Sequence, residues 1–385
     1  MPHILLLLCL PVALLLLSCS PNTDKQDGFA FGDTVKLRYA TGFEIIRSGD
    51  STQITAFNPW VKGSIFAQYR LNASKNDIIS IQNQHIANNL ERIGSFSSTA
   101  IGYLTLLNAQ DRIGGVADGD LLYDTALYDT FAKGLLPSLG MHMVDSYEAI
   151  IDANLDALVK SGFEQSPAQD ARYCGVGIPI IYVNDWTETH PLARAEWIKF
   201  IACFIGKSAS ADSVFDKIES GYLHAKERAA GYSKSPKVLA GGEYKGTWYV
   251  PGGKSYFAQL LSDAHASYAW AEDSTVGSIT LSLETVFDKS ADAECWLSSQ
   301  DATPGELIKR DKRMQHFNCI TNNRLFTYNK RMGAGGGNDY WESGPCRPDI
   351  ILQDFIAIIH GQNKFDSLFY FTQLQDITRH VQNKR

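Results

Sequence analysis

One stretch near the middle of the chain, residues 190–231, constrains the fold more than any other. Pro191 suits the first turn of a helix, because the N–H that proline lacks has no helical partner there. From residue 195 to residue 205 only Glu196 and Lys199 are charged, so apolar side chains cover most of the helix circumference. A helix that is apolar nearly all round must be covered on more than one side. We therefore expect a buried helix here.

A second helix is expected from about residue 210 to residue 231, because its apolar residues form a single stripe among charges. Two interpretations of the pair remain open. The buried helix is either a rigid connector between two lobes or an ordinary core helix of one large domain. A chain of 385 residues favours two cores over one.

The N-terminus resembles an export signal. Residues 4–17 are almost entirely apolar, yet this run is short for a membrane span. Leu16-Leu17-Ser18-Cys19 is similar to a bacterial lipobox, in which the cysteine is lipidated after cleavage. We predict a lipoprotein signal peptide over 1–18, a lipid anchor on Cys19 and a polar tether over 19–34. An ordinary signal peptide cleaved at another position is the alternative.

Strand and helix patterns alternate on both sides of the central stretch, which is typical of α/β lobes. Short strands at 35–39, 44–47, 53–57 and 65–71 indicate an antiparallel start. Further expected strands include 93–96, 111–116, 178–183, 237–239, 294–297 and 325–328, with helices at 101–107, 257–264 and 348–359. We assign the N-terminal lobe to 35–188, the central helices to 189–232, the C-terminal lobe to 233–362 and a tail to 363–385.

The two halves contain a similar segment. Residues 148–157 align without gaps to residues 284–293, with Glu, Asp, Asp and Ala at the same four offsets. Each copy is predicted to be a short helix that leads through a loop into a strand. One copy in each half favours two similar lobes.

Catalytic motifs are missing from the sequence. The Lys254-Ser255 pair lacks the glycine of a phosphate-binding loop, because Trp248 occupies the position six residues before the lysine. The histidines form no metal-binding pair, and no Gly-x-Ser-x-Gly nucleophile motif occurs. The net charge of −7 and the absence of a basic run exclude a nucleic-acid footprint. We therefore predict a protein that is not an enzyme.

The cysteines indicate neither a zinc site nor a disulfide framework. Outside the N-terminal segment their number is odd, and they are Cys174, Cys203, Cys295, Cys319 and Cys346. One pair among the last three is left open, whereas Cys203 is expected to pack within the central helix.

Aromatic residues and one arginine gather in loop-like sequence: Trp60, Trp248, Tyr249, Tyr256, Arg331, Tyr340 and Trp341. Rings give a large contact area at low entropy cost, which suits a bulky, flat or chelated ligand held between lobes. Ordinary packing is the alternative for each residue. The glycine-rich run 332–339 lacks the dinucleotide-binding pattern, so we expect backbone bends or a close approach to a ligand there.

Three segments together resemble one family: PLARAEWIKF, GTWYVPGGKSYFAQLLSDA, and GGGNDYWESG followed by RPDIILQDFIAIIH. They are similar to the periplasmic substrate-binding proteins of ABC importers for ferric siderophores, haem and cobalamin. The resemblance covers about residues 90–360. It implies an α/β fold of two Rossmann-like lobes joined by a single long interlobe helix, the class III type. It also implies capture of a metal chelate outside the inner membrane and delivery to a permease.

The resemblance assigns roles to individual residues. Glu148 and Glu284, which begin the repeated segment, match surface glutamates that dock onto permease arginines. The alternative is two exposed glutamates that the helix dipole favours. The ligand site would be lined by Ser97, Ser98, Thr99, Trp248, Tyr249, Tyr256, Arg331, Asn338, Tyr340 and Trp341. Ala100 departs from relatives that carry histidine there.

We therefore expect a lipid-anchored monomer with modest lobe closure, no cofactor of its own and an ABC permease dimer as partner. Its ligand would be a ferric siderophore, cobalamin or haem, and the scarcity of cations disfavours strongly anionic catecholates. Two alternatives remain: a scavenging lipoprotein that has no permease, and an enzyme on the same fold that acts on such a ligand.

Overall fold

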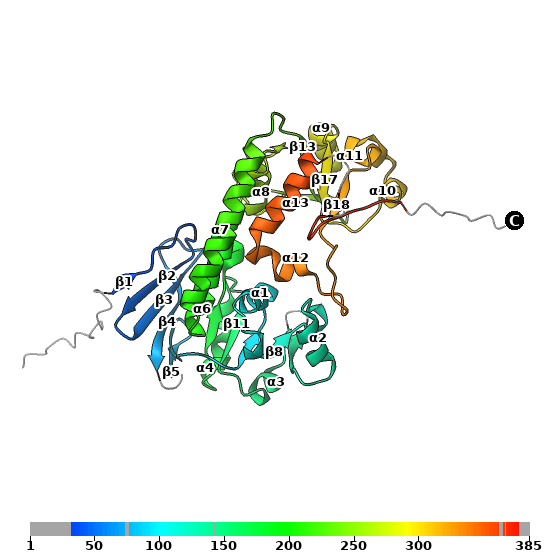
Figure 1. Cartoon of the computed structure of the whole chain (residues 1–385). Helices are drawn as coiled ribbons and strands as arrows, with labels where there is room; N and C mark the ends of the chain where they lie inside the picture. Colours follow the sequence, from blue (N-terminus) through cyan, green and yellow to red (C-terminus); the bar gives the residue numbers. More distant parts are fainter. Residues whose placement is uncertain (1–31, 74–76, 142–143, 362–364, 366, 377–385) are drawn as a thin grey trace, which may run out of the picture.

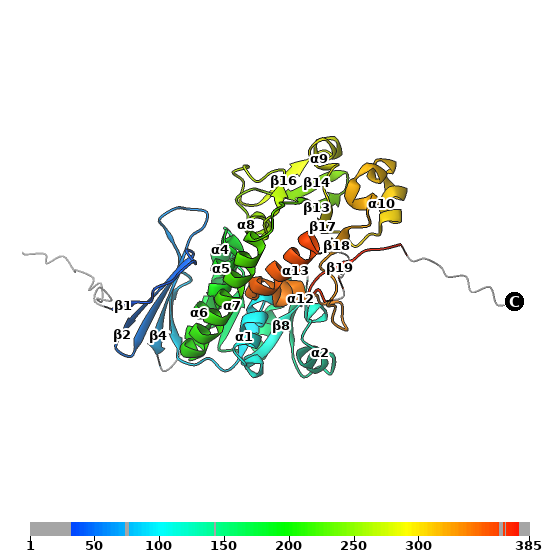
Figure 2. The same ribbon diagram turned by 45° about the horizontal axis from the view of Figure 1, so that its top comes forward.

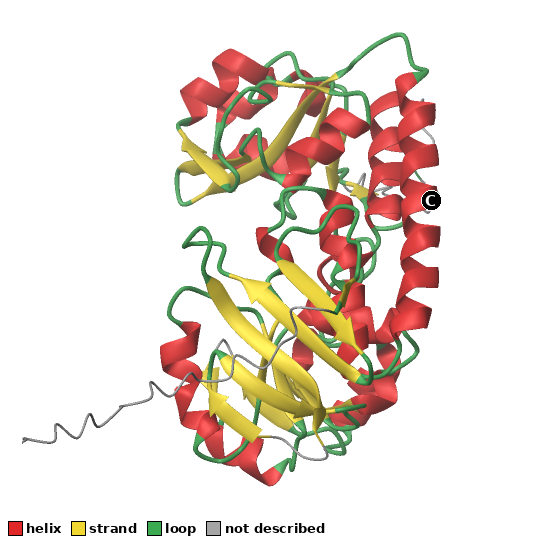
Figure 3. Ribbon diagram, turned by 90° about the vertical axis from the view of Figure 1, so that its left-hand side faces the viewer, coloured by secondary structure: helices red, strands yellow, loops and turns green. Residues whose placement is uncertain are grey.

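The computed structural model describes residues 32–73, 77–141, 144–361, 365 and 367–376. These residues form three sheets, of which two belong to lobes stacked end to end beside one long helix (Figures 1 and 3). The signal peptide predicted over 1–18, the lipid anchor predicted at Cys19 and the tether up to residue 31 lie outside the described residues. So does much of the tail predicted over 363–385.

The first sheet comes from the N-terminal part of the chain and has the order β1-β2-β3-β4-β6-β5. Its pairs are antiparallel except for β4 with β6. The lobe predicted over 35–188 therefore contains two sheets. The strands are β1 (Asp33–Thr34), β2 (Phe43–Ser48), β3 (Ser51–Phe57), β4 (Ile65–Ala73), β5 (Asp77–Ser80) and β6 (Asn83–Ala87).

The strand predicted over 35–39 is wrong: the Val35 N–H bonds to Ile45 of β2 at 2.9 Å, but buried carboxylates rather than a neighbouring strand accept from the backbone at residues 38–40. Glu196 accepts hydrogen bonds from the N–H groups of residues 38, 39 and 40 at 2.8–3.0 Å. Glu188 likewise accepts from those of Thr41 and Gly42 at 3.0 and 2.8 Å. These contacts fix the first sheet to the middle of the chain.

The N-terminal lobe is built on a sheet of order β10-β9-β8-β7-β11-β12, parallel except for β10. Its strands are β7 (Ile93–Ser95), β8 (Ile113–Ala117), β9 (Ser138–Met141), β10 (Val144–Asp145), β11 (Ala157–Lys160) and β12 (Ile180–Tyr182). Its helices are α1 (Ser98–Leu106), α2 (Thr125–Ala132), α3 (Tyr147–Asp152) and α4 (Ser166–Cys174), with short turns η1 (Gln110–Arg112), η2 (Gly119–Leu121) and η3 (Asp185–Thr187).

The C-terminal lobe repeats this plan. Its central strands β15, β13, β17 and β18 pair in parallel, whereas β14 pairs antiparallel with β13 and β16, and β19 pairs antiparallel with β18. Its strands are β13 (Lys237–Tyr244), β14 (Thr247–Pro251), β15 (Ser267–Tyr268), β16 (Ser278–Leu281), β17 (Cys295–Ser298), β18 (Leu325–Thr327) and β19 (Thr372–Gln373). Its helices are α8 (Tyr256–Asp263), α9 (Leu283–Ser290), α10 (Pro304–Arg310), η4 (Lys312–His316), α11 (Asn318–Thr321), α12 (Asp339–Glu342), η5 (Gly344–Cys346) and α13 (Pro348–His360). The α/β fold class is thus confirmed.

The central stretch forms α5 (Pro191–Glu196), α6 (Ile198–Phe204) and α7 (Ser208–Ala230). The helix that runs beside both lobes is α7, not the apolar stretch 191–205 that the sequence suggested (Figure 1). With 23 residues, α7 is about 35 Å long at 1.5 Å per residue. The α5–α6 pair is covered on all sides, and rings of the first sheet supply part of that cover, with Phe43 4.8 Å from Trp197.

The repeated segment has the predicted structure in both lobes, since α3 leads into β11 and α9 leads into β17. Its second aspartate ties neighbouring strands together. Asp156 accepts hydrogen bonds from two N–H groups just before β7, both at 2.8 Å. Asp292 accepts a hydrogen bond at 2.7 Å from the side-chain ammonium of Lys237, the first residue of β13. The match in sequence therefore reflects a match in structure.

The glycine-rich run bends as expected, with Gly336 at a φ of +103°, and it packs closely against the other lobe. A β-carbon on Gly335 would lie 2.4 Å from the carbonyl oxygen of Asp120, and one on Gly337 would lie 2.3 Å from that of Leu121. Glu342 in α12 also accepts hydrogen bonds from the N–H groups of residues 123 and 124. The two hydrogen bonds to Glu342 therefore hold the lobes together where the glycine-rich run packs closely.

Candidate functional site

Two cavities lie at the carboxyl ends of the parallel strands, one in each lobe, where open α/β sheets bind ligands. The N-terminal cavity has a volume of about 490 Å³ and the C-terminal cavity about 380 Å³. Phe163 lines the first and Trp186 lines the second, and the centroids of their rings are 5.5 Å apart. The two cavities therefore adjoin and form one candidate site between the lobes.

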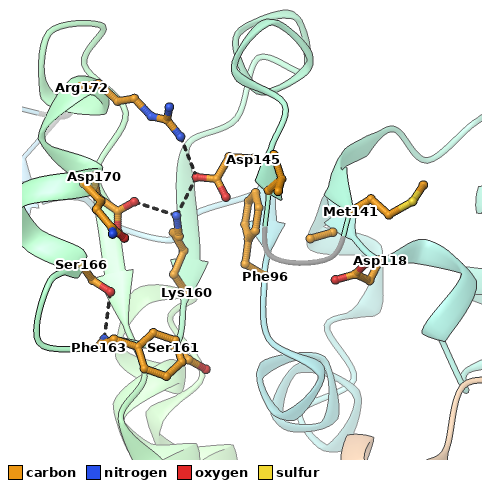
Figure 4. Close-up of a pocket in the computed structure, with 13 residues that line it drawn as sticks. Phe96, Asp118, Met141, Asp145, Lys160, Ser161, Phe163, Ser166, Asp170 and Arg172 are labelled. Atoms are coloured by element: carbon orange, nitrogen blue, oxygen red, sulfur yellow. Dashed lines mark hydrogen bonds and ion pairs between the residues drawn. The ribbon is translucent and has the colours of Figure 1, made fainter.

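The N-terminal cavity has a mixed lining that contains a charged cluster organised around Lys160 at the end of β11 (Figure 4). The Lys160 ammonium lies 2.8 Å from Asp145 and 2.7 Å from Asp170. Asp145 also accepts hydrogen bonds from the Tyr173 hydroxyl at 2.7 Å and the Arg172 guanidinium at 3.1 Å. Burial would raise the pKa of Asp145, but these hydrogen bonds, led by that of Lys160, outweigh it and lower the pKa.

Charge is nearly balanced in this cavity. Its lining contains the carboxylates of Asp118, Asp145 and Asp170 and the cations of Lys160 and Arg172. The cations contact the carboxylates, so they are not available as a bare positive surface. Such a cavity disfavours a strongly anionic ligand, because the ligand would lie against carboxylates.

The C-terminal cavity is mainly aromatic. Tyr249 and Trp341 are 41% and 48% exposed, and Trp186 contributes a third accessible ring. Among the described residues that line this cavity only Glu188 is charged, and it is held by Thr41, Gly42 and the Trp197 indole. Accessible rings with few charges suit a flat, largely apolar ligand face.

Four of the predicted site residues lie together in this cavity. Tyr249, Tyr256, Tyr340 and Trp341 all line it. Tyr340 forms its floor, because it is 2% exposed and stacks on Tyr328 with centroids 4.5 Å apart. Tyr256 begins α8, and the Arg194 guanidinium lies 4.6 Å from the centre of its ring.

Trp248 was predicted wrongly, because neighbouring residues of a strand point to opposite faces of the sheet. Tyr249 of β14 faces the cavity, whereas Trp248 is fully buried on the other face. Its ring stacks on Trp296 with centroids 5.2 Å apart. Trp248 is therefore a core residue.

Arg331 and Asn338 stabilise the glycine-rich run and are not among the residues that line either cavity. Arg331 forms an ion pair with Asp339 at 2.5 Å and lies 4.2 Å from the centre of the Phe369 ring. Asn338 caps α12, because its side-chain oxygen accepts a hydrogen bond from the Tyr340 N–H.

The Ser97-Ser98-Thr99 turn starts α1, and the cavity lining includes Phe96 but none of these three residues. Ser97 is the N-cap of α1 and accepts a hydrogen bond from the N–H of Ala100 at 3.3 Å. Ala100, which follows this turn, is fully buried.

Sequence reasoning missed the lysine–aspartate network and the Phe163–Trp186 contact. One signal was available, because Lys160 ends the strand of the repeated segment and Phe163 lies in the loop that follows it. Carboxyl ends of parallel strands are where ligand-binding residues gather. Asp145 and Asp170 gave no such signal, since they come from other elements.

Glu148 and Glu284 occupy equivalent places, each in the first turn of its helix and each exposed. Figure 1 places α3 and α9 at opposite ends of the molecule, one in each lobe. Glu284 forms an ion pair with Arg313 at 2.6 Å. Hydrogen bonding from its own backbone N–H and from Arg313 lowers the pKa of Glu284.

Cys203, Cys295, Cys319 and Cys346 are free thiols, so no pair forms among the last three. Over the described ranges, no group of three or more metal-ligating side chains is present. Within the same ranges, no helix is long and apolar enough to cross a membrane.

A family model described as "Periplasmic binding protein" matches residues 104–332. Two relatives come from Methanocaldococcus jannaschii. One is an uncharacterized lipoprotein, 24% identical over 284 residues that span 71% of this chain and 66% of the relative. The other is an uncharacterized protein, 24% identical over 319 residues that span 79% of this chain and 93% of the relative.

Solved structures show the same fold at low identity. A possible iron-binding periplasmic protein of Staphylococcus epidermidis has a TM-score of 0.56 at 18% identity, over 71% of this chain and 100% of its own. The periplasmic haem-binding protein of Vibrio cholerae has a TM-score of 0.52 at 16% identity, over 68% and 98%. The vitamin B12-binding protein of the same organism has a TM-score of 0.51 at 14% identity, over 71% and 99%.

Proposed function

The chain belongs to the periplasmic binding protein family, and we propose that it is the substrate-binding lipoprotein of an ABC importer. Its ligand would be a metal chelate of the ferric-siderophore, cobalamin or haem type, held between the lobes and delivered to an inner-membrane permease. The observation that carries this proposal is the pair of adjoining cavities at the carboxyl ends of the two sheets.

The chemistry of the cavities supports a chelate with one broad apolar face. The rings of Tyr249, Tyr256 and Trp341 can cover such a face, while the N-terminal cavity offers hydrogen-bonding groups to its polar edge. The balanced charges favour haem-like, cobalamin-like or hydroxamate ligands over catecholates. Structural neighbours named as haem-binding and vitamin B12-binding proteins are compatible with this choice.

Delivery would use one carboxylate on each lobe. Two exposed glutamates at opposite ends of the molecule, Glu148 and Glu284, would give a permease two charge-assisted contacts that also fix orientation. The exposed Glu284–Arg313 pair contributes little to stability, so a permease arginine can replace Arg313. Lipidation of Cys19 would keep the protein at the membrane.

The first test is thermal stability with cobalamin, haemin, a ferric trihydroxamate and a ferric tricatecholate. A ligand at 100 times its Kd should stabilise the protein by about 2.7 kcal/mol. Tyr249→Ala and Trp341→Ala should abolish most of that shift. Tyr244→Ala is the matched control, because Tyr244 is a 62% exposed ring in the same lobe that does not line the cavity. The absence of any shift would refute the chelate assignment.

Uptake separates the two alternatives from the proposal. Glu148→Ala with Glu284→Ala should abolish uptake of the chelate by cells and leave binding unchanged. Unchanged uptake would instead indicate a scavenger without a permease. A product that accumulates from the bound chelate would indicate an enzyme.

A further inference from the structure

We propose that the N-terminal sheet supplies one wall of the ligand site, through Trp60 in the loop between β3 and β4. This inference rests on the proposed function and deepens it, since it assigns a specificity residue for the bulky outer part of the chelate. The loop comprises residues 58–64. Trp60 was one of the aromatic candidates from the sequence, but it does not line either of the two cavities.

The loop holds Trp60 in a defined position. The side-chain oxygen of Asn58 accepts hydrogen bonds from the N–H groups of Trp60 and Val61, at 2.9 and 3.0 Å. The Asn58 N–H donates to the carbonyl oxygen of Ser64 at 3.0 Å, which closes the loop. Gly63 adopts a φ of +79°, which only glycine adopts readily, and thereby completes the turn.

A row of rings connects Trp60 to both cavities. Trp60 packs on Phe66 with centroids 5.4 Å apart and lies 6.2 Å from Trp186. Trp186 lines the aromatic cavity and is 5.5 Å from Phe163, which lines the N-terminal one. Trp60 is thus the outermost ring of a row that begins where the two cavities meet.

Apolar side chains in this row and beside it are exposed. Val61 is 52% exposed, Ile65 48%, and Trp186 and Phe163 are each 41% exposed. Apolar groups exposed together, unlike scattered ones, mark a binding surface. Because the row continues directly into the cavity lining through Trp186, its occupant is the ligand held in those cavities.

The sheet that carries the loop is fixed relative to the cavity. Glu188 lines the aromatic cavity and also binds the N–H groups of Thr41 and Gly42, which precede β2. Figure 3 shows this sheet in front, with one hairpin end pointing toward the C-terminal lobe. The family match begins at residue 104, after all six strands of this sheet, so the wall is an addition to the matched region.

The physical consequence is selectivity for size. A tryptophan adds a large, rigid contact area at low entropy cost, but only a ligand that extends beyond the cavities reaches it. Loss of a well-packed aromatic contact of this kind typically weakens binding roughly tenfold, since 1.4 kcal/mol corresponds to a factor of ten. We expect this loss to appear mainly as faster dissociation.

The test compares wild-type protein with Trp60→Ala, Trp60→Phe and the control Tyr244→Ala, using whichever of cobalamin, haemin and the ferric trihydroxamate stabilises the wild type. Trp60→Ala should bind roughly tenfold more weakly, Trp60→Phe should be intermediate, and Tyr244→Ala should be unchanged. Trp60→Phe retains a ring against Phe66, so it covers the case in which Trp60→Ala does not fold.

The outcomes separate this inference from the proposed function. Wild-type protein that binds none of the probes refutes the proposed function, and the inference with it. Wild-type affinity in both Trp60 variants refutes the inference alone. An equal loss of affinity in Tyr244→Ala also overturns it, because the effect would then not be specific to the loop.

Discussion

Replacing Gly102 with alanine tests whether the two lobes are in backbone contact. Gly102 lies buried in α1, and a β-carbon there would be 2.1 Å from the carbonyl oxygen of Glu342 in α12. That oxygen belongs to the backbone, so it cannot turn aside as a flexible side chain can. The helices would have to separate, and the contact between the lobes would loosen.

The expected magnitude is the difference between two opposing effects. Alanine is favoured over glycine within a helix by about 1 kcal/mol. Overpacking a tight contact costs about 1–3 kcal/mol, and a clash with backbone belongs at the upper end of that range. The free energy of unfolding should therefore fall by about 2 kcal/mol, measured by urea denaturation.

Gly221→Ala is the matched control, because Gly221 is also a helical glycine, in α7. Its β-carbon would meet only the side chain of Asp349, nearest at 3.3 Å, and no backbone atom comes closer. Gly221→Ala should leave stability unchanged or raise it by up to about 1 kcal/mol. If Gly102→Ala is as stable as the wild type, the lobes are not held together by this close approach.

Three further perturbations test other parts of the structure. Burial raises the pKa of Glu342 from its ordinary 4.5 to about 7, so the folded state holds the proton more tightly than the unfolded state. The free energy of unfolding of the wild type should therefore fall relative to that of Glu342→Gln as pH rises from 4.5 to about 7. A difference in unfolding free energy that stays constant over this pH range would contradict the prediction. Glu196→Ala should cost at least about 3 kcal/mol, because it removes the acceptor for three N–H groups at 38–40 and the partner of a buried lysine. Limited proteolysis should then cut within 35–42, and protection equal to the wild type would argue against this attachment. Lys160→Met should destabilise by about 3 kcal/mol, since it leaves the buried Asp170 carboxylate without its cation, whereas Asp145 keeps Arg172; adding Asp170→Asn should recover part of the loss.

Local pattern was enough to predict the α/β alternation and the doubled architecture. Periodicity along a segment depends on which face is buried, and that information is in the segment itself. The match between 148–157 and 284–293 was visible because both lobes use the same helix–loop–strand unit. The family resemblance could also be recognised from the sequence, because the segments that carry it are contiguous. Four of the aromatic site residues, among them Tyr249 and Trp341, followed from their place in that resemblance.

Other features depend on residues far apart in the chain, and only the tertiary structure decided them. Tyr249 and Trp248 are neighbours of the same class, and the packing of the sheet determines which of them faces the cavity. The sequence of the glycine-rich run predicted bends or a close approach to a ligand, but it could not indicate that the run packs against Asp120 and Leu121 of the other lobe.

The role of each central helix was decided in the same way. The apolar stretch 191–205 was expected to connect the lobes, but the first sheet covers it, and α7 with its single apolar stripe runs beside both. The sequence by itself determined most helices and strands and their repetition in two lobes, because short-range periodicity encodes them. Tertiary structure alone decided which charges pair and which rings meet, because those contacts join residues that the chain separates by tens to hundreds of positions.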